Sequence, residues 1–162
     1  MFLNSSILWW LSETISSFLL DKEVTTSFWF NGLTNPFQNR FGCRVMKHGY
    51  VPSGTSGVCI MQVFGASPPR ATTLQLRVYN GSLAYYRGSV LVPNIYERWF
   101  RLNVIHDVDA SRIKIYIDGI LKHEASGCGG TSYYFKLGVY WQIDQSYYME
   151  CRWKGIKVLK NM

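Results

Sequence analysis

The alternation of polar and apolar side chains is clearest at residues 133–142. Odd-numbered positions there are bulky and apolar or aromatic, and even-numbered positions are polar apart from Gly138. A period of two predicts a β-strand with one face in a core and the other within reach of water. The polar face carries Tyr134, Lys136, Tyr140 and Gln142, and Gly138 leaves room for a ligand near the backbone. This face suits an anionic, hydroxyl-rich ligand, and a half-solvated strand explains it equally well.

The same pattern predicts further strands from Gly49 onward, where no segment has a helical period. Asn80-Gly81 and Asp118-Gly119 separate pairs of predicted strands and are typical of tight hairpin turns, because these residues tolerate positive φ. The predicted strands occupy residues 58–64, 74–79, 83–87, 99–106, 113–117, 120–124 and 149–159. Strands at regular spacing with turns between them predict an all-β sandwich or jelly roll.

Residues 1–48 have a different pattern. Residues 7–20 are apolar-rich, but Glu13 and several serines interrupt them, so the stretch is too short and polar to span a bilayer. No Lys or Arg precedes it, so a clear secretory signal is lacking. No strand is predicted before Gly49. We therefore predict a divergent N-terminal segment over 1–48, either a degenerate signal or replaced strands, and a β-sandwich domain over 49–162.

Composition narrows the class of partner. A chain of 162 residues, 48% hydrophobic and 17% charged, is one globular domain's worth of sequence. Its net charge of +7 favours acidic partners. The Lys and Arg residues are dispersed, so we expect no nucleic-acid binding. Without C-x-x-C spacing or clustered histidines we expect no metal and no other cofactor. The four cysteines permit two disulfides or buried free thiols: Cys43, Cys59, Cys128 and Cys151.

Three polar features lie on otherwise apolar strands. Gln62 is the single polar residue within 58–64, and a buried amide must find hydrogen-bond partners or face a cleft. Arg77 shares the polar side of 74–79 with Gln75 and Tyr79, which are either surface or ligand-binding residues. The third feature is the polar face of 133–142. β-Elimination from a polyuronate needs a neutralised carboxylate, a base and an acid. Tyrosine can supply the last two if a nearby cation favours its phenolate.

Residues 134–142, Tyr-Phe-Lys-Leu-Gly-Val-Tyr-Trp-Gln, resemble the YFKAGVYNQ signature of the jelly-roll alginate lyases. Residues 60–64 lie where that family carries QIH. Other blocks resemble the plant citrate-binding-protein group, which shares this type of domain, and they are residues 49–57, 60–66, 98–107 and 149–154. The resemblance covers roughly 49–162. It implies an all-β, concanavalin A-like jelly-roll β-sandwich that lacks part of the N-terminal outer strands and binds its ligand on the concave sheet.

The resemblance also assigns roles to individual positions. Gln62 matches the glutamine that helps to neutralise the uronate carboxylate. Tyr140 matches the catalytic acid, with Tyr134 as second choice, while Lys136 and Gln142 match groove positions. Phe64 stands where the family carries its histidine base, and a phenyl ring cannot accept a proton. The arginine-rich strand R-T/S-E-x-R has no counterpart. Losing a positioned base costs about 10²–10⁴-fold in rate.

We therefore expect the groove to bind an acidic ligand, either a uronate-containing polysaccharide or citrate, with little or no catalysis. The expected ligand-binding residues are Gln62, Lys136, Gln142 and Arg77. The alternatives are a polysaccharide lyase that cleaves a polyuronate with Tyr140 as acid and base, and a lectin-like protein without anionic preference. The resemblance implies a secreted plant protein of the cell wall or vacuole. We expect a monomer without a membrane span.

Overall fold

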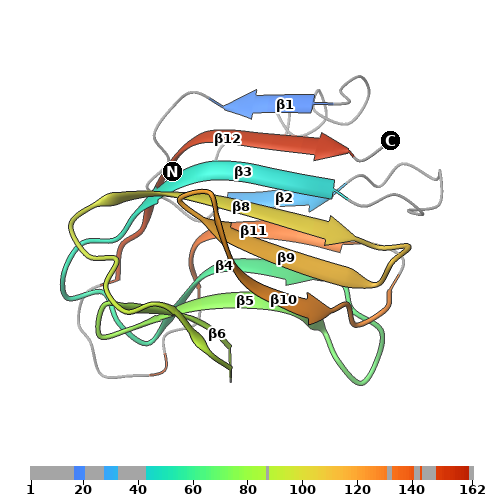
Figure 1. The fold of residues 1–162 in the computed structure, drawn as a ribbon, viewed down its shortest axis with the longest axis horizontal. Helices are drawn as coiled ribbons and strands as arrows, with labels where there is room; N and C mark the ends of the chain where they lie inside the picture. Colours follow the sequence, from blue (N-terminus) through green and yellow to red (C-terminus); the bar gives the residue numbers. More distant parts are fainter. Residues whose placement is uncertain are drawn as a thin grey trace.

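The computed structural model describes residues 17–20, 28–32, 43–86, 88–130, 133–140, 143 and 149–160. For residues 17–20 and 28–32, and at positions 43, 134, 140, 158 and 160, the description covers the backbone alone. The described residues form two antiparallel six-stranded sheets that stack as a sandwich (Figure 1). No helix occurs among them. The predicted all-β sandwich is confirmed.

The first sheet has the strand order β1-β12-β3-β8-β9-β10. Its strands are β1 (Ser17–Leu20), β12 (Arg152–Lys160), β3 (Cys43–Tyr50), β8 (Trp99–Asp107), β9 (Arg112–Ile117) and β10 (Ile120–Ser126). The second sheet has the order β2-β11-β4-β5-β6-β7. Its strands are β2 (Phe28–Gly32), β11 (Tyr133–Tyr140), β4 (Val58–Phe64), β5 (Thr72–Tyr79), β6 (Ser82–Tyr85) and β7 (Val90–Val92). The sequential strands β8-β9-β10 and β4-β5-β6-β7 pair as neighbours, and the remaining neighbours are distant in sequence.

The segment before Gly49 supplies strands to both sheets, although its sequence pattern predicts none. β1 pairs with β12, and β2 pairs with β11. β3 begins at Cys43 and lies between β12 and β8, with Val45 fully buried opposite Val104. The division at 48/49 into two parts stays a prediction about domain organisation.

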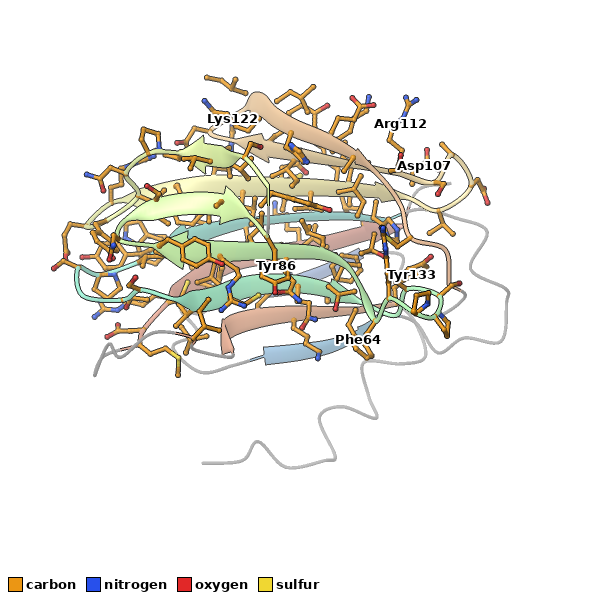
Figure 2. All side chains as sticks on the ribbon, turned by 90° about the horizontal axis from the view of Figure 1, so that it is seen from below. Phe64, Tyr86, Asp107, Arg112, Lys122 and Tyr133 are labelled. Carbon is orange, nitrogen blue, oxygen red and sulfur yellow. The ribbon has the colours of Figure 1, made fainter. Side chains whose placement is uncertain are left out.

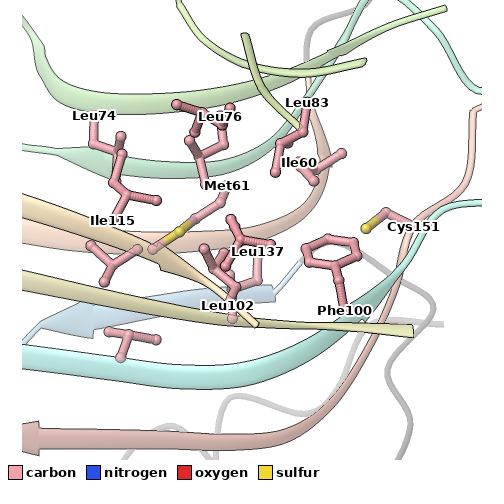
Figure 3. Close-up of a cluster of buried hydrophobic side chains, with 14 of the residues drawn as sticks. Ile60, Met61, Leu74, Leu76, Leu83, Phe100, Leu102, Ile115, Leu137 and Cys151 are labelled. Carbon is pink, nitrogen blue, oxygen red and sulfur yellow. The ribbon is translucent and has the colours of Figure 1, made fainter. Parts of the chain in front are cut away.

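The core lies between the sheets and is filled by the alternating apolar positions (Figure 3). On β11 the side chains of Tyr133, Phe135 and Leu137 are buried, which confirms the apolar face predicted for this strand. Phe100 and Leu102 on β8 meet them from the first sheet. Full burial of one such side chain contributes about 1.5–3 kcal/mol. The repeated pattern of period two therefore stabilises the sandwich as well as predicting its strands.

A lysine lies inside this core. Lys47 on β3 stands opposite Leu102, is 1% exposed, and has no hydrogen-bond partner for its Nζ. The ammonium lies 4.8 Å from the centroid of a Trp153 ring, which gives it a cation–π contact. Burial lowers the pKa of Lys47 well below its ordinary value, and the nearby Cys151 opposes that shift only in part. Lys47 therefore occupies an apolar position at a cost in free energy.

A histidine joins the two sheets. His106 on β8 is 1% exposed, and its ring packs edge-on against that of Tyr133 on β11 with 4.4 Å between centroids. The Tyr133 hydroxyl donates to the carbonyl oxygens of Gly129 and Gly130 at 2.8 and 3.1 Å. His106 Nδ1 has no hydrogen-bond partner, and burial lowers the pKa of His106 to about 4. The imidazole is thus neutral at ordinary pH.

The described cysteine side chains are free thiols. Cys59 and Cys151 are buried, and Cys128 is partly exposed. Of the two states that the cysteine count permits, these three residues adopt the unpaired one. The described part of the chain contains no helix long and apolar enough to cross a membrane.

Candidate ligand-binding site

Two β-bulges shape the outer face of the second sheet. One cross-strand row, read from β5 through β4 to β11, consists of Leu76, Met61 and Leu137, and a second row consists of Arg77, Cys59 and Tyr140. From the first row to the second, β5 advances by one residue, β4 by two and β11 by three. Gly138 sits in the β11 bulge with a φ of +116°, a conformation that only glycine adopts readily. The glycine is thus required by the backbone, in addition to the open space that its sequence position suggested.

Lys136, Gln62 and Gln75 form one row across β11, β4 and β5. Lys136 is 8% exposed, and its Nζ lies 4.5 Å from the centroid of the Phe64 ring. Burial lowers the pKa of Lys136. The expectation that this strand face is half-solvated is therefore wrong at Lys136, because the ammonium lies against an aromatic ring. An ammonium stripped of water in this way interacts strongly with a nearby anion.

Gln62 is buried at 4% exposure and is only partly satisfied. Its Nε2 donates to Thr72 Oγ1 at 2.6 Å, while its Oε1 is buried without a hydrogen-bond partner. A carbonyl oxygen in that state costs free energy until a donor reaches it. This confirms the expectation that a lone amide on an apolar strand must either find partners or face a cleft, and both hold here.

A hollow of about 360 Å³ opens beside Gln62. It is lined by Gln62, Phe64, Ala71, Thr72, Thr73, Leu74, Gln75, Tyr85 and Tyr86. Figure 2 shows Phe64 and Tyr86 on the second sheet. Gln75 Oε1 and Thr73 Oγ1 are buried and, like Gln62 Oε1, have no hydrogen-bond partner. The hollow thus combines aromatic walls with several oxygen atoms that can bind hydroxyl groups.

Arg77 lies on β5 two residues beyond Gln75, opposite Cys59. Its side chain is 1% exposed, and its Nη2 donates to the carbonyl oxygen of Gly57 at 2.7 Å. The guanidinium lies 5.8 and 5.4 Å from the ring centroids of Tyr79 and Tyr86. The reading of Arg77 as a surface residue is therefore wrong, since these groups enclose it. Burial raises the pKa of Cys59 to about 11, and the charge of Arg77 opposes that shift.

The structure brings some of the predicted site residues together. Gln62 and Lys136 are cross-strand neighbours, and Arg77 lies two residues beyond Gln75 on β5. Tyr134 pairs with Phe64, and Tyr140 pairs with Cys59, so the bulge separates Tyr140 from the Gln62 row. The side chains of these two tyrosines lie outside the described part, and Gln142 lies outside the described residues. Their roles stay predictions.

The strand that flanks β11 on its other side is β2, with the sequence Phe-Trp-Phe-Asn-Gly. Its Trp29 stands opposite Lys136, and the strand contains no arginine. This agrees with the absence of the arginine-rich strand in the sequence. The guanidinium described on this face belongs to Arg77 on β5.

Sequence reasoning missed the wall made by Thr72, Thr73, Tyr85 and Tyr86. Tyr85 donates a hydrogen bond from its hydroxyl to the Thr73 carbonyl oxygen at 3.3 Å, and burial raises its pKa. The Tyr-Tyr doublet at the end of β6 was the available signal. Tyr85 ends β6 and packs partly against the core, Tyr86 follows it, and both line the hollow.

Solved structures share this fold, and three alginate lyases are among them. The enzyme from Alteromonas sp. 272 aligns with a TM-score of 0.64 at 10% identity over 100% of both chains. The alginate lyase AlgAT5, of polysaccharide lyase family 7, aligns with a TM-score of 0.60 at 15% identity, over 86% of this chain and 69% of its own. The enzyme from Corynebacterium sp. aligns with a TM-score of 0.58 at 15% identity, over 75% of this chain and 59% of its own. At these identities the likeness shows the fold alone.

The family follows from the sequence. The model of the alginate lyase family matches residues 23–160, and the chain belongs to this family. The match begins ahead of Gly49 and takes in β2 and β3. A citrate-binding protein from Hevea brasiliensis is 50% identical over 140 residues, which cover 78% of this chain and 58% of the relative. The chain thus spans less than two thirds of that protein.

Proposed function

We propose that the hollow on the second sheet binds an acidic ligand, a uronate-containing polysaccharide or citrate, with little or no catalysis. The observation that carries the proposal is the buried ammonium of Lys136 beside Gln62, next to a hollow with unsatisfied oxygen atoms. An anion near Lys136 offsets the cost of burying its charge. Hydroxyl groups on the same ligand supply donors to Gln62 Oε1, Thr73 Oγ1 and Gln75 Oε1.

The chemistry of the walls favours a uronate over citrate. A uronate sugar carries a single carboxylate, several hydroxyls and an apolar ring face, whereas citrate is mostly carboxylate. The hollow offers several hydrogen-bonding oxygens and the rings of Tyr85 and Tyr86, which suit a sugar ring. The relatives support both ligands, since one is named a citrate-binding protein and the family is that of the alginate lyases.

Binding without efficient chemistry is supported at Phe64. By resemblance this position holds the base that removes the proton from the sugar, and here a phenyl ring packs against the Lys136 ammonium. A phenyl ring accepts no proton, so elimination would depend on tyrosine alone. Without a base, the reaction is slower by about 10²–10⁴-fold.

Titration calorimetry with uronate oligomers and with citrate tests the proposal. We expect heat from the uronate, and an affinity about 10- to 150-fold weaker in Lys136→Gln, because a charged hydrogen bond is worth about 1.5–3 kcal/mol. Lys122→Gln is the matched control, since Lys122 is exposed on β10 in the other sheet. A folded protein that gives no heat with either ligand contradicts the proposal.

The second candidate is a polysaccharide lyase. It is favoured by the register of Tyr140, which lies in the same row as Cys59 and Arg77 on this sheet. The absorbance of unsaturated uronates, followed on polyglucuronate, alginate and pectate, separates the two functions. We expect no product above the blank. Product formation that Tyr140→Phe abolishes would replace the binding-only proposal with the lyase.

A further inference from the structure

We propose that the outer face of the first sheet, which points away from the hollow, is a second binding surface that takes an acidic polysaccharide chain. The surface centres on Lys154, His48 and Arg101, which we call the basic row. The register places them side by side on β12, β3 and β8, because Lys154 pairs with His48 and His48 pairs with Arg101. These three strands are neighbours in the sheet (Figure 1).

The basic row lies on the solvent side of its sheet. On β3 the flanking residues Lys47 and Gly49 are buried and face the core, so His48 points outward. His48 and Arg101 are exposed, and Lys154 is half-buried. Neighbouring strands are about 4.8 Å apart, so the three residues span about 10 Å of surface.

The row carries the charges of Lys154 and Arg101, and the Asp118 carboxylate interacts electrostatically with Arg101. No ion pair joins its members to a carboxylate in the part of the chain that the structure describes. The Asp118 carboxylate accepts a hydrogen bond from the Arg98 side chain at 3.1 Å and another from the Arg101 backbone nitrogen at 2.8 Å. Lys154 and Arg101 thus bring two like charges to one face, on either side of His48, and an anion bound between them would offset their repulsion.

Two aromatic residues border the basic row. Tyr50 and Trp99 are paired on β3 and β8, with 5.5 Å between their ring centroids. Lys154 Nζ lies 3.9 Å from the Trp99 ring centroid, and the Arg152 guanidinium lies 5.3 Å from that of Tyr50. The contact with Trp99 holds the Lys154 ammonium in place, whereas Arg152 also forms an ion pair with Glu150. Flat rings beside fixed cations suit a polymer of acidic sugars, because sugar faces pack on aromatic rings while carboxylates meet the charges.

The extent of the charge indicates a chain rather than a compact acid. Beyond the basic row, Lys157 stands opposite Met46, and Arg44 bonds Asn103 Oδ1 at 2.9 Å on the same face. A polysaccharide with a carboxylate on each sugar can reach successive cations along this face. The inference does not depend on the hollow, because the two sets of residues belong to different sheets.

The test is the affinity of the full chain for long polygalacturonate at low ionic strength. We expect Arg101→Gln and Lys154→Gln each to weaken binding by about two- to fivefold, and Lys154→Arg to retain it. Lys122→Gln removes the same charge from an exposed site on β10 and should leave the affinity unchanged. Binding should weaken as salt is added, because exposed charges are screened.

Equal affinities for Arg101→Gln, Lys154→Gln and Lys122→Gln, in proteins that melt like the parent, would overturn the proposal. It is also overturned if phosphatidylserine vesicles or duplex DNA bind through the row while polygalacturonate does not. A short uronate oligomer separates the two surfaces. Lys136→Gln should weaken its binding, whereas the basic-row variants should affect only the long chain.

Discussion

Lys136 and Phe64 determine together what the hollow can do. The ammonium is held over the ring at 4.5 Å, where burial lowers its pKa. In this pair the charge proposed to hold an acid is kept, and a hydrocarbon ring stands where the resemblance implies a base. The pairing therefore supports the proposed binding function.

Ligand binding should depend on pH through Lys136. Because its pKa is lowered from 10.5, the ammonium loses its proton at a lower pH than an exposed lysine does. Anion affinity should therefore fall as pH rises through the lowered pKa, and Lys136→Gln should remove that dependence. Calorimetric titration of a uronate oligomer across the alkaline range measures both. A pH profile that is the same in the parent and in Lys136→Gln would contradict this role.

Replacing Lys47 with methionine should stabilise the fold. The substitution keeps the volume and removes an unsatisfied buried amine, which costs about 1–3 kcal/mol, while forfeiting about 0.5–1 kcal/mol of cation–π contact. The parent's stability should rise with pH between the lowered pKa of Lys47 and its unfolded value of 10.5, since the unfolded state binds more protons there.

Urea unfolding of Lys47→Met at neutral and alkaline pH measures both effects. The variant should lose the rise in stability toward alkaline pH. Lys122→Met, at an exposed site, serves as the control and should leave the unfolding free energy nearly unchanged. A destabilised Lys47→Met would show that the amine makes a favourable contact in the core.

At the scale of elements, the strands were largely predictable because burial on one face imposes a period of two. The strand over 58–64 matches β4, and the two predicted hairpins match β5-β6 and β9-β10. β7 was missed because it has only three residues, Val90–Val92, of which Val90 is exposed. β3 was missed because Lys47 and Gly49 stand at core positions, so the apolar alternation is broken there.

The bulges could not be predicted from local pattern. Where strands advance by different numbers of residues, the row that a side chain joins depends on its neighbours rather than on its own sequence. Gln62 and Lys136 fell into one row, whereas Tyr140 joined the row of Cys59. The lining residues Thr73, on β5, and Tyr86, directly after β6, come to the hollow only through tertiary pairing.

Gly138→Ala should damage the β11 bulge. A φ of +116° is unfavourable for any residue with a Cβ, so we expect a loss of about 1–3 kcal/mol in unfolding free energy. Uronate affinity should fall as well, because the bulge sets the register next to Lys136. Chemical unfolding and calorimetry on the same preparation test this. Unchanged stability would mean that the bulge relaxes at no cost.

For the whole molecule, composition and alternation were sufficient to predict an all-β sandwich, and the net charge of +7 pointed to acidic partners. The distribution of that charge was not predictable. Only the pairing of β12, β3 and β8 places Lys154, His48 and Arg101 in one row. Basic residues that are far apart in the sequence are thereby brought together on one face of the first sheet.

The contact between His106 and Tyr133 links the sheets and should make the sandwich sensitive to acid. The pKa of His106 is about 4 in the fold against 6.5 when unfolded. Unfolding therefore takes up a proton between these values, and stability should fall as pH drops from 6.5 to about 4, by up to about 3 kcal/mol.

Thermal unfolding over this pH range, compared with His106→Phe, tests the link. The aromatic replacement keeps the packing against Tyr133 and should flatten the profile. His48→Phe removes an exposed imidazole and serves as the control, with a profile like that of the parent. If His106→Phe keeps the parent's acid sensitivity, other groups are responsible.

The lysine enclosed between the sheets has one more consequence. An amine-reactive acylating reagent in water cannot reach Lys47 while the sandwich is closed, because the side chain is 1% exposed. Exposed amines such as that of Lys122 react at once, so acylation at Lys47 proceeds only during openings that part β3 from the core. Mass spectrometry of that one site over time therefore gives the frequency of those openings, so Lys47 serves as a built-in probe of local unfolding in the core.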